Sequence, residues 1–338
     1  MQPFAARPRP PGPEPIDSLA GDVQYYLTLT PRQLPSRYLY DPLGSALFEA
    51  ICELPWYRIT KAERALLQRH AGEVFARVDP LSTLVELGPG SGDKLAALIR
   101  AGGARSRRLS VHLVDISAAA LDLATRTITA LEAGDLAIVS HQATYESGLV
   151  EAMAQRPTAR PEPGRGVGRA LTLFLGSNIG NFDPPGADAF LRGVRASLAG
   201  GDALLVGTDL VKPERELLLA YDDPLGVTAA FNRNLLVRVN RELGADFDVT
   251  AFQHRALWNA ADSRVEMHLV AGRAQTVHIP GASLDVAFEE GETIWTESSY
   301  KYHPEDVVRM LERAGFKAAE QWVSDTDGFA LTLVEANG

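Results

Sequence analysis

The feature that most restricts the fold of this chain is a regular alternation of apolar runs and helical patterns between residues 81 and 211. Five runs of strand length, each bounded by turn residues, indicate buried parallel strands at 81–87, 109–115, 136–141, 170–176 and 202–211. Helical patterns lie between them at 93–103, 118–134 and 186–201. This order predicts an α/β fold in which a doubly wound parallel sheet is covered by helices on both faces.

The C-terminal end departs from a plain dinucleotide-binding pattern. A helical pattern at 304–315 is followed by two apolar runs, 317–323 and 329–335, which are separated by a segment that ends in Asp-Gly. Asp-Gly between two such runs predicts a β-hairpin, whereas a dinucleotide-binding fold would continue with parallel crossovers. The pattern therefore resembles the class I methyltransferase (Rossmann-like) sheet, whose last strand is antiparallel.

About 90 residues between the fifth run and the last helix do not belong to the wound core. Their first part is helical and their second part alternates as strands do, so we expect an inserted α+β domain. We predict that 212–301 and 17–62 form this substrate-binding domain, and that 63–211 and 302–338 form the wound domain. The proline-rich residues 1–16 are expected to be a flexible leader.

Composition and charge limit the classes of function. The chain has 338 residues and a formal net charge of −10, which disfavours nucleic acid and suits a small or cationic ligand. Its single cysteine, Cys52, excludes an internal disulfide and a zinc–thiolate cluster, and the seven histidines show no metal-ligand spacing. We expect no metal. With no membrane-spanning stretch and no signal-peptide pattern, the sequence predicts a cytoplasmic protein, which we expect to be a monomer.

Three glycines at alternate positions, Gly88, Gly90 and Gly92, follow the first apolar run. Such a loop often binds a nucleotide-like cofactor, although alone it is a weak signal. Pro89 lacks the backbone N–H that a phosphate would use, and Glu86 places a carboxylate beside the loop. Both features disfavour a pyrophosphate and favour a cation, and S-adenosylmethionine carries an ammonium and a sulfonium but no phosphate.

Asp115 ends the second apolar run, at the position where an acid in this type of fold binds ribose hydroxyls. Asp115 supports an adenosine-containing cofactor but does not show which of these cofactors is bound. Two alternatives stay open from these residues alone: a nicotinamide cofactor, or a tight turn with Asp115 as a helix cap.

After the fourth run, the glycine loop at 174–182 allows a close backbone approach to a ligand, and its Asn181 can donate and accept hydrogen bonds. The alternative there is a glycine-rich turn capped by Asn181.

Several long stretches of the chain together resemble one family, the L-histidine Nα-methyltransferases of ergothioneine biosynthesis. The resemblance runs from about residue 17 to the end and rests on YLYDPLGSALFEAICELPWYRITKAER, ELGPGSGDK, FLGSNIGN, AYDDPLGVTAAFNRNLL, NRELGADFD, VEMHL and ETIWTESSYK. It implies S-adenosylmethionine as the cofactor, L-histidine as the substrate, and trimethylation of the α-amino group to hercynine. It also implies that the wound domain is the S-adenosylmethionine-dependent methyltransferase domain.

The resemblance further implies roles for individual residues. Tyr57, Asn181 and Tyr221 match the groups that hold the carboxylate and α-amine of the amino acid, so we expect them to orient the reacting amine as the catalytic residues. Glu297 and Ser299 match the pair that holds the imidazole, and their i, i+2 spacing on a strand places them on one face. The remaining matches are Tyr40, Phe48, Gly176 and Met267 in the substrate pocket, and Gly88, Lys94 and Asp115 at the cofactor, where Gly90 and Gly92 complete the loop.

The chain departs from the family pattern after the third apolar run. Where the family has an acid and then an aromatic residue near the adenine, this chain reads HQATYES, which places Ala143 and Thr144 at those two positions. We expect the adenine contact from Ala143 and Thr144, or alternatively from Tyr145 or Glu146.

Three other functions fit the sequence less well than histidine methylation. A related enzyme could methylate another free amino acid such as tryptophan or tyrosine, but Glu297 together with Met267 favours histidine, since we expect an indole or phenol ring to gain nothing from a buried carboxylate. A macromolecule methyltransferase would need an open groove, which the inserted domain and the acidic surface disfavour. A binding module without catalysis is disfavoured because Tyr57, Asn181 and Glu297 are all present.

Overall fold

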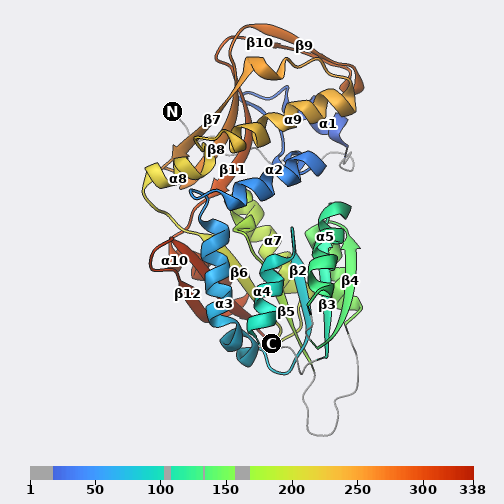
Figure 1. Ribbon diagram of the computed structural model, residues 1–338, viewed down its shortest axis with the longest axis vertical. Coiled ribbons are helices and arrows are strands. Elements are labelled where there is room, and N and C mark those ends of the chain that lie inside the picture. The colour runs from blue at the N-terminus through green and yellow to red at the C-terminus, as the bar shows by residue number, and fades with distance from the viewer. Residues whose placement is uncertain (1–17, 103–107, 132–133, 157–167) are drawn as a thin grey trace. The chain divides into compact units, whose positions relative to one another are not determined.

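The computed structural model describes residues 18–102, 108–131, 134–156 and 168–338. The chain divides into two compact units, here called unit 1 (residues 1–58 and 212–300) and unit 2 (residues 59–211 and 301–338) (Figure 1). The change of unit falls at Arg58 because the helix that begins at Ile59 packs in unit 2. The predicted leader at 1–16 lies outside the described residues, as do 103–107 at the end of a predicted helix and 132–133 near the end of another.

Unit 2 is built on a seven-stranded sheet with the strand order β12-β13-β6-β5-β2-β3-β4. Strands β2 to β6 pair in parallel, whereas β13 is antiparallel to both β6 and β12. This confirms the predicted class I methyltransferase sheet with its terminal hairpin. The strands are β2 (Leu81–Leu87), β3 (Arg108–Asp115), β4 (Asp135–Gln142), β5 (Arg169–Phe174), β6 (Ala203–Asp209), β12 (Phe316–Val323) and β13 (Phe329–Ala336).

Helices cover both faces of this sheet (Figure 1). On one face pack α3 (Ile59–Arg77), α4 (Asp93–Ala101) and α5 (Ala118–Thr129); on the other pack α6 (Tyr145–Ala154), α7 (Pro184–Ser197) and α10 (Pro304–Arg313). Val85 and Leu87 belong to the apolar core under α6, α7 and α10. Because side chains alternate along a strand, Glu86 between them points to the face that carries α3, α4 and α5. Helix α6 was not predicted.

Unit 1 contains a four-stranded sheet in the order β1-β11-β8-β7 and a separate hairpin of β9 and β10. The N-terminal segment joins the insertion because β1 pairs in parallel with β11. Helix α9 packs on β7, β8 and α2. The elements are α1 (Leu19–Tyr26), β1 (Arg32–Gln33), α2 (Pro42–Glu53), α8 (Glu214–Tyr221), α9 (Val227–Leu243), β7 (Phe252–Asn259), β8 (Arg264–Ala271), β9 (Gln275–Ile279), β10 (Leu284–Phe288) and β11 (Thr293–Tyr300).

Two segments of unit 2 run side by side where the chain leaves for the insertion and returns from it. The N–H of Tyr302 donates to the carbonyl of Asp209 at 3.1 Å, and the N–H of Val211 donates to the carbonyl of Tyr302 at 2.9 Å. Beside them, Lys301 Nζ lies 2.9 Å from Asp209 Oδ2, and both side chains are buried. This ion pair and these hydrogen bonds fix both ends of the insertion on β6.

Candidate active site

The loop after β2 has the backbone conformation that its glycines make possible. Gly88, Gly90 and Gly92 have φ angles of 75°, 55° and 78°, in the left-handed region that favours glycine. At Gly92 a side chain is also excluded by packing, because a Cβ atom there would lie 2.9 Å from the Cα of Ala124 on α5. At Gly88 a Cβ atom would lie 2.9 Å from the hydroxyl oxygen of Tyr145. The loop therefore passes close to α5 and to Tyr145.

Glu86, at the end of β2, is a buried carboxyl group without a hydrogen bond. The side chain is 0% exposed, and neither carboxylate oxygen has a hydrogen-bonding partner among the described residues. Burial raises the pKa of Glu86 from 4.5 to about 8; Lys94 opposes this rise, and the negative charges of Glu63 and Asp115 add to it. An unpaired buried carboxyl group beside a glycine loop fits a positively charged ligand.

Lys94, on the first turn of α4, pairs with an acid that the sequence reading missed. Its Nζ lies 3.2 Å from Oε2 of Glu63 on α3, and Glu63 is fully buried. Both carboxylate oxygens of Glu63 also accept the N–H of Gly176, at 2.8 and 2.9 Å. The signal for Glu63 in the sequence was an acid on the apolar face of a helix, between Ala62 and Leu66.

The predicted ribose and adenine positions lie at the ends of β3 and β4. The carboxylate of Asp115 accepts the N–H of Ser117 at 2.9 Å, and burial raises its pKa. The N–H of Ala143 donates to the backbone carbonyl of Asp115 at 3.1 Å, so the two predicted cofactor residues are neighbours. Thr144 is the N-cap of α6, where its hydroxyl accepts the N–H of Ser147 at 3.4 Å.

Tyr145, which the sequence offered as an alternative adenine contact, lies against the glycine loop. Its hydroxyl is next to Gly88, and its ring packs on Phe174 of β5 with the centroids 5.4 Å apart. Burial raises the pKa of the Tyr145 hydroxyl, which keeps it neutral. Of the four candidate positions, Tyr145 is thus the one with a ring beside this loop.

The second glycine loop follows β5. Gly176 and Ser177 both have left-handed φ angles, 74° and 58°, and the hydroxyl oxygen of Ser177 accepts the N–H of Asp209 at 2.9 Å. The short helix Asn178–Asn181 comes next, and its last residue, Asn181, is exposed. Glu63 and Asp209 thus hold the start of this loop, and Asn181 lies at its exposed end.

In unit 1 the structure brings four predicted substrate residues into one aromatic cluster. Ring centroids are 5.5 Å apart for Tyr40 and Phe48, 6.1 Å for Phe48 and Tyr57, and 6.3 Å for Tyr57 and Tyr221. Phe231 of α9 completes the cluster at 5.5 Å from Tyr40, and sequence reasoning missed it. Its signal was its position in the AYDDPLGVTAAFNRNLL stretch.

The predicted imidazole-binding pair also lies in unit 1. Met267 of β8 is the direct neighbour of Glu297 on β11, and the hydroxyl of Tyr221 donates to that of Ser299 at 2.8 Å. Glu297 is only 9% exposed. A β-bulge between Trp295 and Glu297 changes the register, so that Glu297 faces the side of Met267.

A buried network of hydrogen bonds connects Tyr221 to Thr296, the residue before Glu297. His254 Nε2 lies 2.8 Å from the carbonyl oxygen of Tyr221, which can only accept, so Nε2 carries the proton and Nδ1 accepts from Asn232 Nδ2 at 2.9 Å. Asn232 Oδ1 in turn accepts from the hydroxyl of Thr296 at 2.7 Å, next to Glu297. Burial lowers the pKa of His254, which agrees with the neutral ring that this network needs.

Comparison with known proteins decides the family. A family model described as histidine-specific methyltransferase, SAM-dependent, matches residues 19–336. The chain belongs to this family. It is 40% identical to a histidine N-alpha-methyltransferase of Mycolicibacterium smegmatis and 41% identical to that of Mycobacterium tuberculosis, with 94% of both chains covered in each case. An L-tryptophan methyltransferase of Psilocybe serbica is 28% identical, with 90% of this chain and 89% of that protein covered.

As a member of this family, the protein depends on S-adenosylmethionine, and the residues around the glycine loop fit that cofactor. The buried carboxyl group of Glu86 lacks a hydrogen-bonding partner within the described part of the chain and would balance positive charge. Asp115 and Tyr145 offer an acceptor and an aromatic ring at neighbouring strand ends. These groups suit an adenosine and a positive charge, and they do not suit a phosphate.

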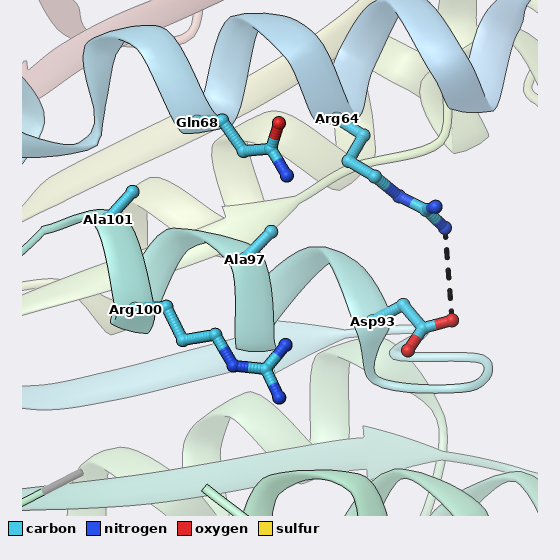
Figure 2. A pocket seen from close by; sticks show the side chains of 6 residues that line it. All are labelled: Arg64, Gln68, Asp93, Ala97, Arg100 and Ala101. Carbon is cyan, nitrogen blue, oxygen red and sulfur yellow. Dashed lines mark ion pairs between the residues drawn. The ribbon is translucent and has the colours of Figure 1, made fainter.

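A cavity of about 410 Å³ lies elsewhere in unit 2, between α3 and α4 (Figure 2). None of the predicted site residues lines it. Its walls are polar side chains and alanines from the two helices, and no strand end contributes to it. An ion pair of 3.8 Å between Arg64 and Asp93 crosses it. We therefore do not assign the methyltransferase reaction to this cavity. Its lining residues are Arg64, Gln68, Asp93, Ala97, Arg100 and Ala101.

The described ranges contain neither a candidate metal site nor a candidate membrane-spanning helix. No group of three or more histidine, cysteine, aspartate or glutamate side chains there could hold a metal ion. No helix in those ranges is long and apolar enough to cross a membrane.

Proposed function

We propose that this enzyme transfers three methyl groups to the α-amino nitrogen of L-histidine and so forms hercynine. The observation that carries this proposal is the buried pair of Glu297 and Ser299 on β11, with Tyr221 bonded to Ser299 and Met267 beside Glu297. A carboxylate can accept the N–H of an imidazole, and a hydroxyl can serve its other nitrogen. An apolar side chain can form a hydrogen bond with neither group. A substrate with such a side chain would therefore bind more weakly than histidine, and the pair would select histidine.

The reacting amine needs orientation more than it needs a strong base. It must be neutral and its lone pair must point along the transfer direction, and a dry pocket lowers the pKa of an amine. We assign this orientation to the hydroxyls of Tyr57 and Tyr221 and to the carboxamide of Asn181. S-adenosylmethionine, when bound, supplies an electrophilic methyl group on a sulfonium.

Repeated methylation requires that the partly methylated amine stay bound between transfers. The cluster of Tyr40, Phe48, Tyr57 and Tyr221 presents aromatic rings with centroids 5.5 to 6.3 Å apart. Rings of this kind attract quaternary ammonium groups through cation–π contacts. We assign retention of the methylated cation to this cluster.

The test is a mass measurement of products. The protein is incubated with S-adenosylmethionine and each common amino acid in turn, and we expect histidine alone to gain methyl groups, up to three. A gain on tryptophan or tyrosine instead would favour the alternative that the similarity to the tryptophan enzyme suggests. No gain on histidine would contradict the proposal.

We also propose that the enzyme acts as a cytoplasmic monomer, because the chain has one cysteine and a strong negative charge. Light scattering coupled to size-exclusion chromatography measures the mass of the particle directly. A mass of two or more chains would contradict the proposed monomer.

A further inference from the structure

We propose that Glu63 is a positioning residue that couples the cofactor contact Lys94 to the loop at 176–181. Nothing in the sequence patterns or the comparisons assigns this residue a role. The part of the proposal that concerns histidine kinetics rests on the proposed function above; the part that concerns cofactor binding does not.

Three segments of unit 2 converge on the Glu63 carboxylate. Lys94 Nζ from α4 lies 3.2 Å from Oε2, and the N–H of Gly176 after β5 reaches both oxygens at 2.8 and 2.9 Å. From β6, Gly207 approaches so closely that a Cβ atom there would lie 2.0 Å from Oε1. The absence of a side chain at Gly207 thus leaves room for this carboxylate between α3 and β6.

Lys94 also lies close to the backbone of Gly176. Its φ angle of 74° is left-handed, and a Cβ atom on it would lie 2.8 Å from Lys94 Nζ. The lysine therefore lies directly against the Gly176 backbone while Glu63 holds both of them. A substitution at Lys94 can therefore alter the position of the loop that ends at Asn181, because the Glu63 carboxylate contacts both Lys94 and Gly176.

Burial makes this arrangement costly to disturb. Glu63 is 0% exposed, and Lys94 is 18% exposed in its side chain. Removing the charge of Glu63 would take this counter-charge away from the partly buried ammonium of Lys94. A glutamine there would also turn an N–H₂ donor toward either Lys94 or the N–H of Gly176, because only one of its two terminal atoms can accept.

Three measurements on Glu63→Gln test the proposal, with Glu73→Gln as the matched control. Glu73 is an exposed acid on the same helix, outside this group of contacts. We expect Glu63→Gln to weaken S-adenosylmethionine binding by about ten- to a hundredfold in calorimetry, since a hydrogen bond to a charged group is lost. We expect faster hydrogen exchange at the Gly176 amide, and a raised KM for histidine.

A double-mutant cycle separates coupling from a general loss of stability. Glu63→Gln, Lys94→Met and the double variant should be non-additive in cofactor affinity, because each single change already breaks the shared contact. If the effects add, or if Glu63→Gln binds the cofactor within twofold of the parent, the proposal is overturned. Cofactor affinity and amide exchange need no histidine, so their outcome is independent of which amino acid is the substrate.

A second variant keeps the test valid if Glu63→Gln does not fold. Lys94→Gln removes the cation and keeps Glu63, and we expect faster exchange in the peptide that contains Gly176, because the carboxylate loses one of its two anchors. Unchanged exchange in a folded Lys94→Gln protein would show that the two segments are not coupled and would overturn the proposal.

Discussion

Replacing Glu86 with glutamine should remove a pH dependence from the stability of the cofactor-free protein. Glu86 is fully buried and both of its carboxylate oxygens lack a partner among the described residues, so the neutral acid is favoured and the pKa rises from 4.5 to about 8. Glutamine has the shape of the protonated acid and no charge. The substitution therefore retains the neutral form at every pH.

The sign and size of the effect follow from the pKa in the two states. Unfolded Glu86 titrates near 4.5, so between that pH and about 8 the folded protein binds more protons, and stability is lost as the pH rises through this window. At 1.36 kcal/mol per pKa unit, the complete loss is at most about 5 kcal/mol. Of this, about 2 to 3 kcal/mol should develop between about pH 6 and about pH 9.

Urea unfolding of both proteins without cofactor, followed by circular dichroism, measures this difference. The free energy of unfolding of Glu86→Gln relative to the parent should rise by about 2 to 3 kcal/mol between about pH 6 and about pH 9, because all other titrating groups are shared. With S-adenosylmethionine added, its positive charges should lower the pKa of Glu86 and reduce this difference. A difference that is flat with pH in the cofactor-free proteins would refute our account of Glu86.

Three further substitutions test other parts of the site. Glu297→Ala should raise KM for histidine by at least about tenfold while calorimetry finds S-adenosylmethionine binding almost unchanged; the reverse pattern would show that Glu297 is misassigned. Asn232→Leu removes the amide that donates to His254 Nδ1 and accepts from Thr296, whose hydroxyl keeps the Met267 carbonyl as an acceptor; the change should lower the free energy of unfolding by about 2 kcal/mol and raise KM for histidine, and a variant as stable as the parent would contradict this. Gly92→Ala should cost about 1 to 3 kcal/mol in thermal unfolding, whereas Gly193→Ala, in a helix with open space around it, should not destabilise; equal effects would contradict the argument from φ and packing.

The wound core could be predicted from sequence because its signals are local. Each strand is a short apolar run with turn residues at both ends, and the Asp-Gly turn alone distinguishes the terminal hairpin from another crossover. Helix α6 was missed because Gly148 interrupts its ten residues. That glycine has a tertiary reason: a Cβ atom there would lie 2.2 Å from Val114 Cγ1. A contact between a helix and a strand that lie about thirty residues apart leaves no trace in a local pattern.

The site divides in the same way between local and tertiary signals. Tyr57, Tyr221 and Ser299 were named from motifs, and the structure places their side chains in one connected group within unit 1. The supporting contacts were not foreseen, because Asn232 and His254 read as ordinary polar residues of a helix and a strand. The bulge before Glu297 was also hidden, since the i, i+2 rule would place Trp295 on the same face.

The acids of unit 2 explain why one glycine loop indicated a methyl donor and not a dinucleotide. A phosphate cradle uses backbone N–H groups and tolerates no neighbouring negative charge, yet this loop contains Pro89 and lies beside Glu86. The structure shows that the acids there are not equivalent. Glu63 forms an ion pair with Lys94 and accepts a hydrogen bond from Gly176, whereas Glu86 has no hydrogen-bonding partner among the described residues. The sequence predicts a negative charge at Glu86, whereas burial in the structure raises its pKa to about 8 and favours the neutral acid. Because Glu86 is buried and has no hydrogen-bonding partner among the described residues, we expect it to be ionised only when a cation is bound beside it.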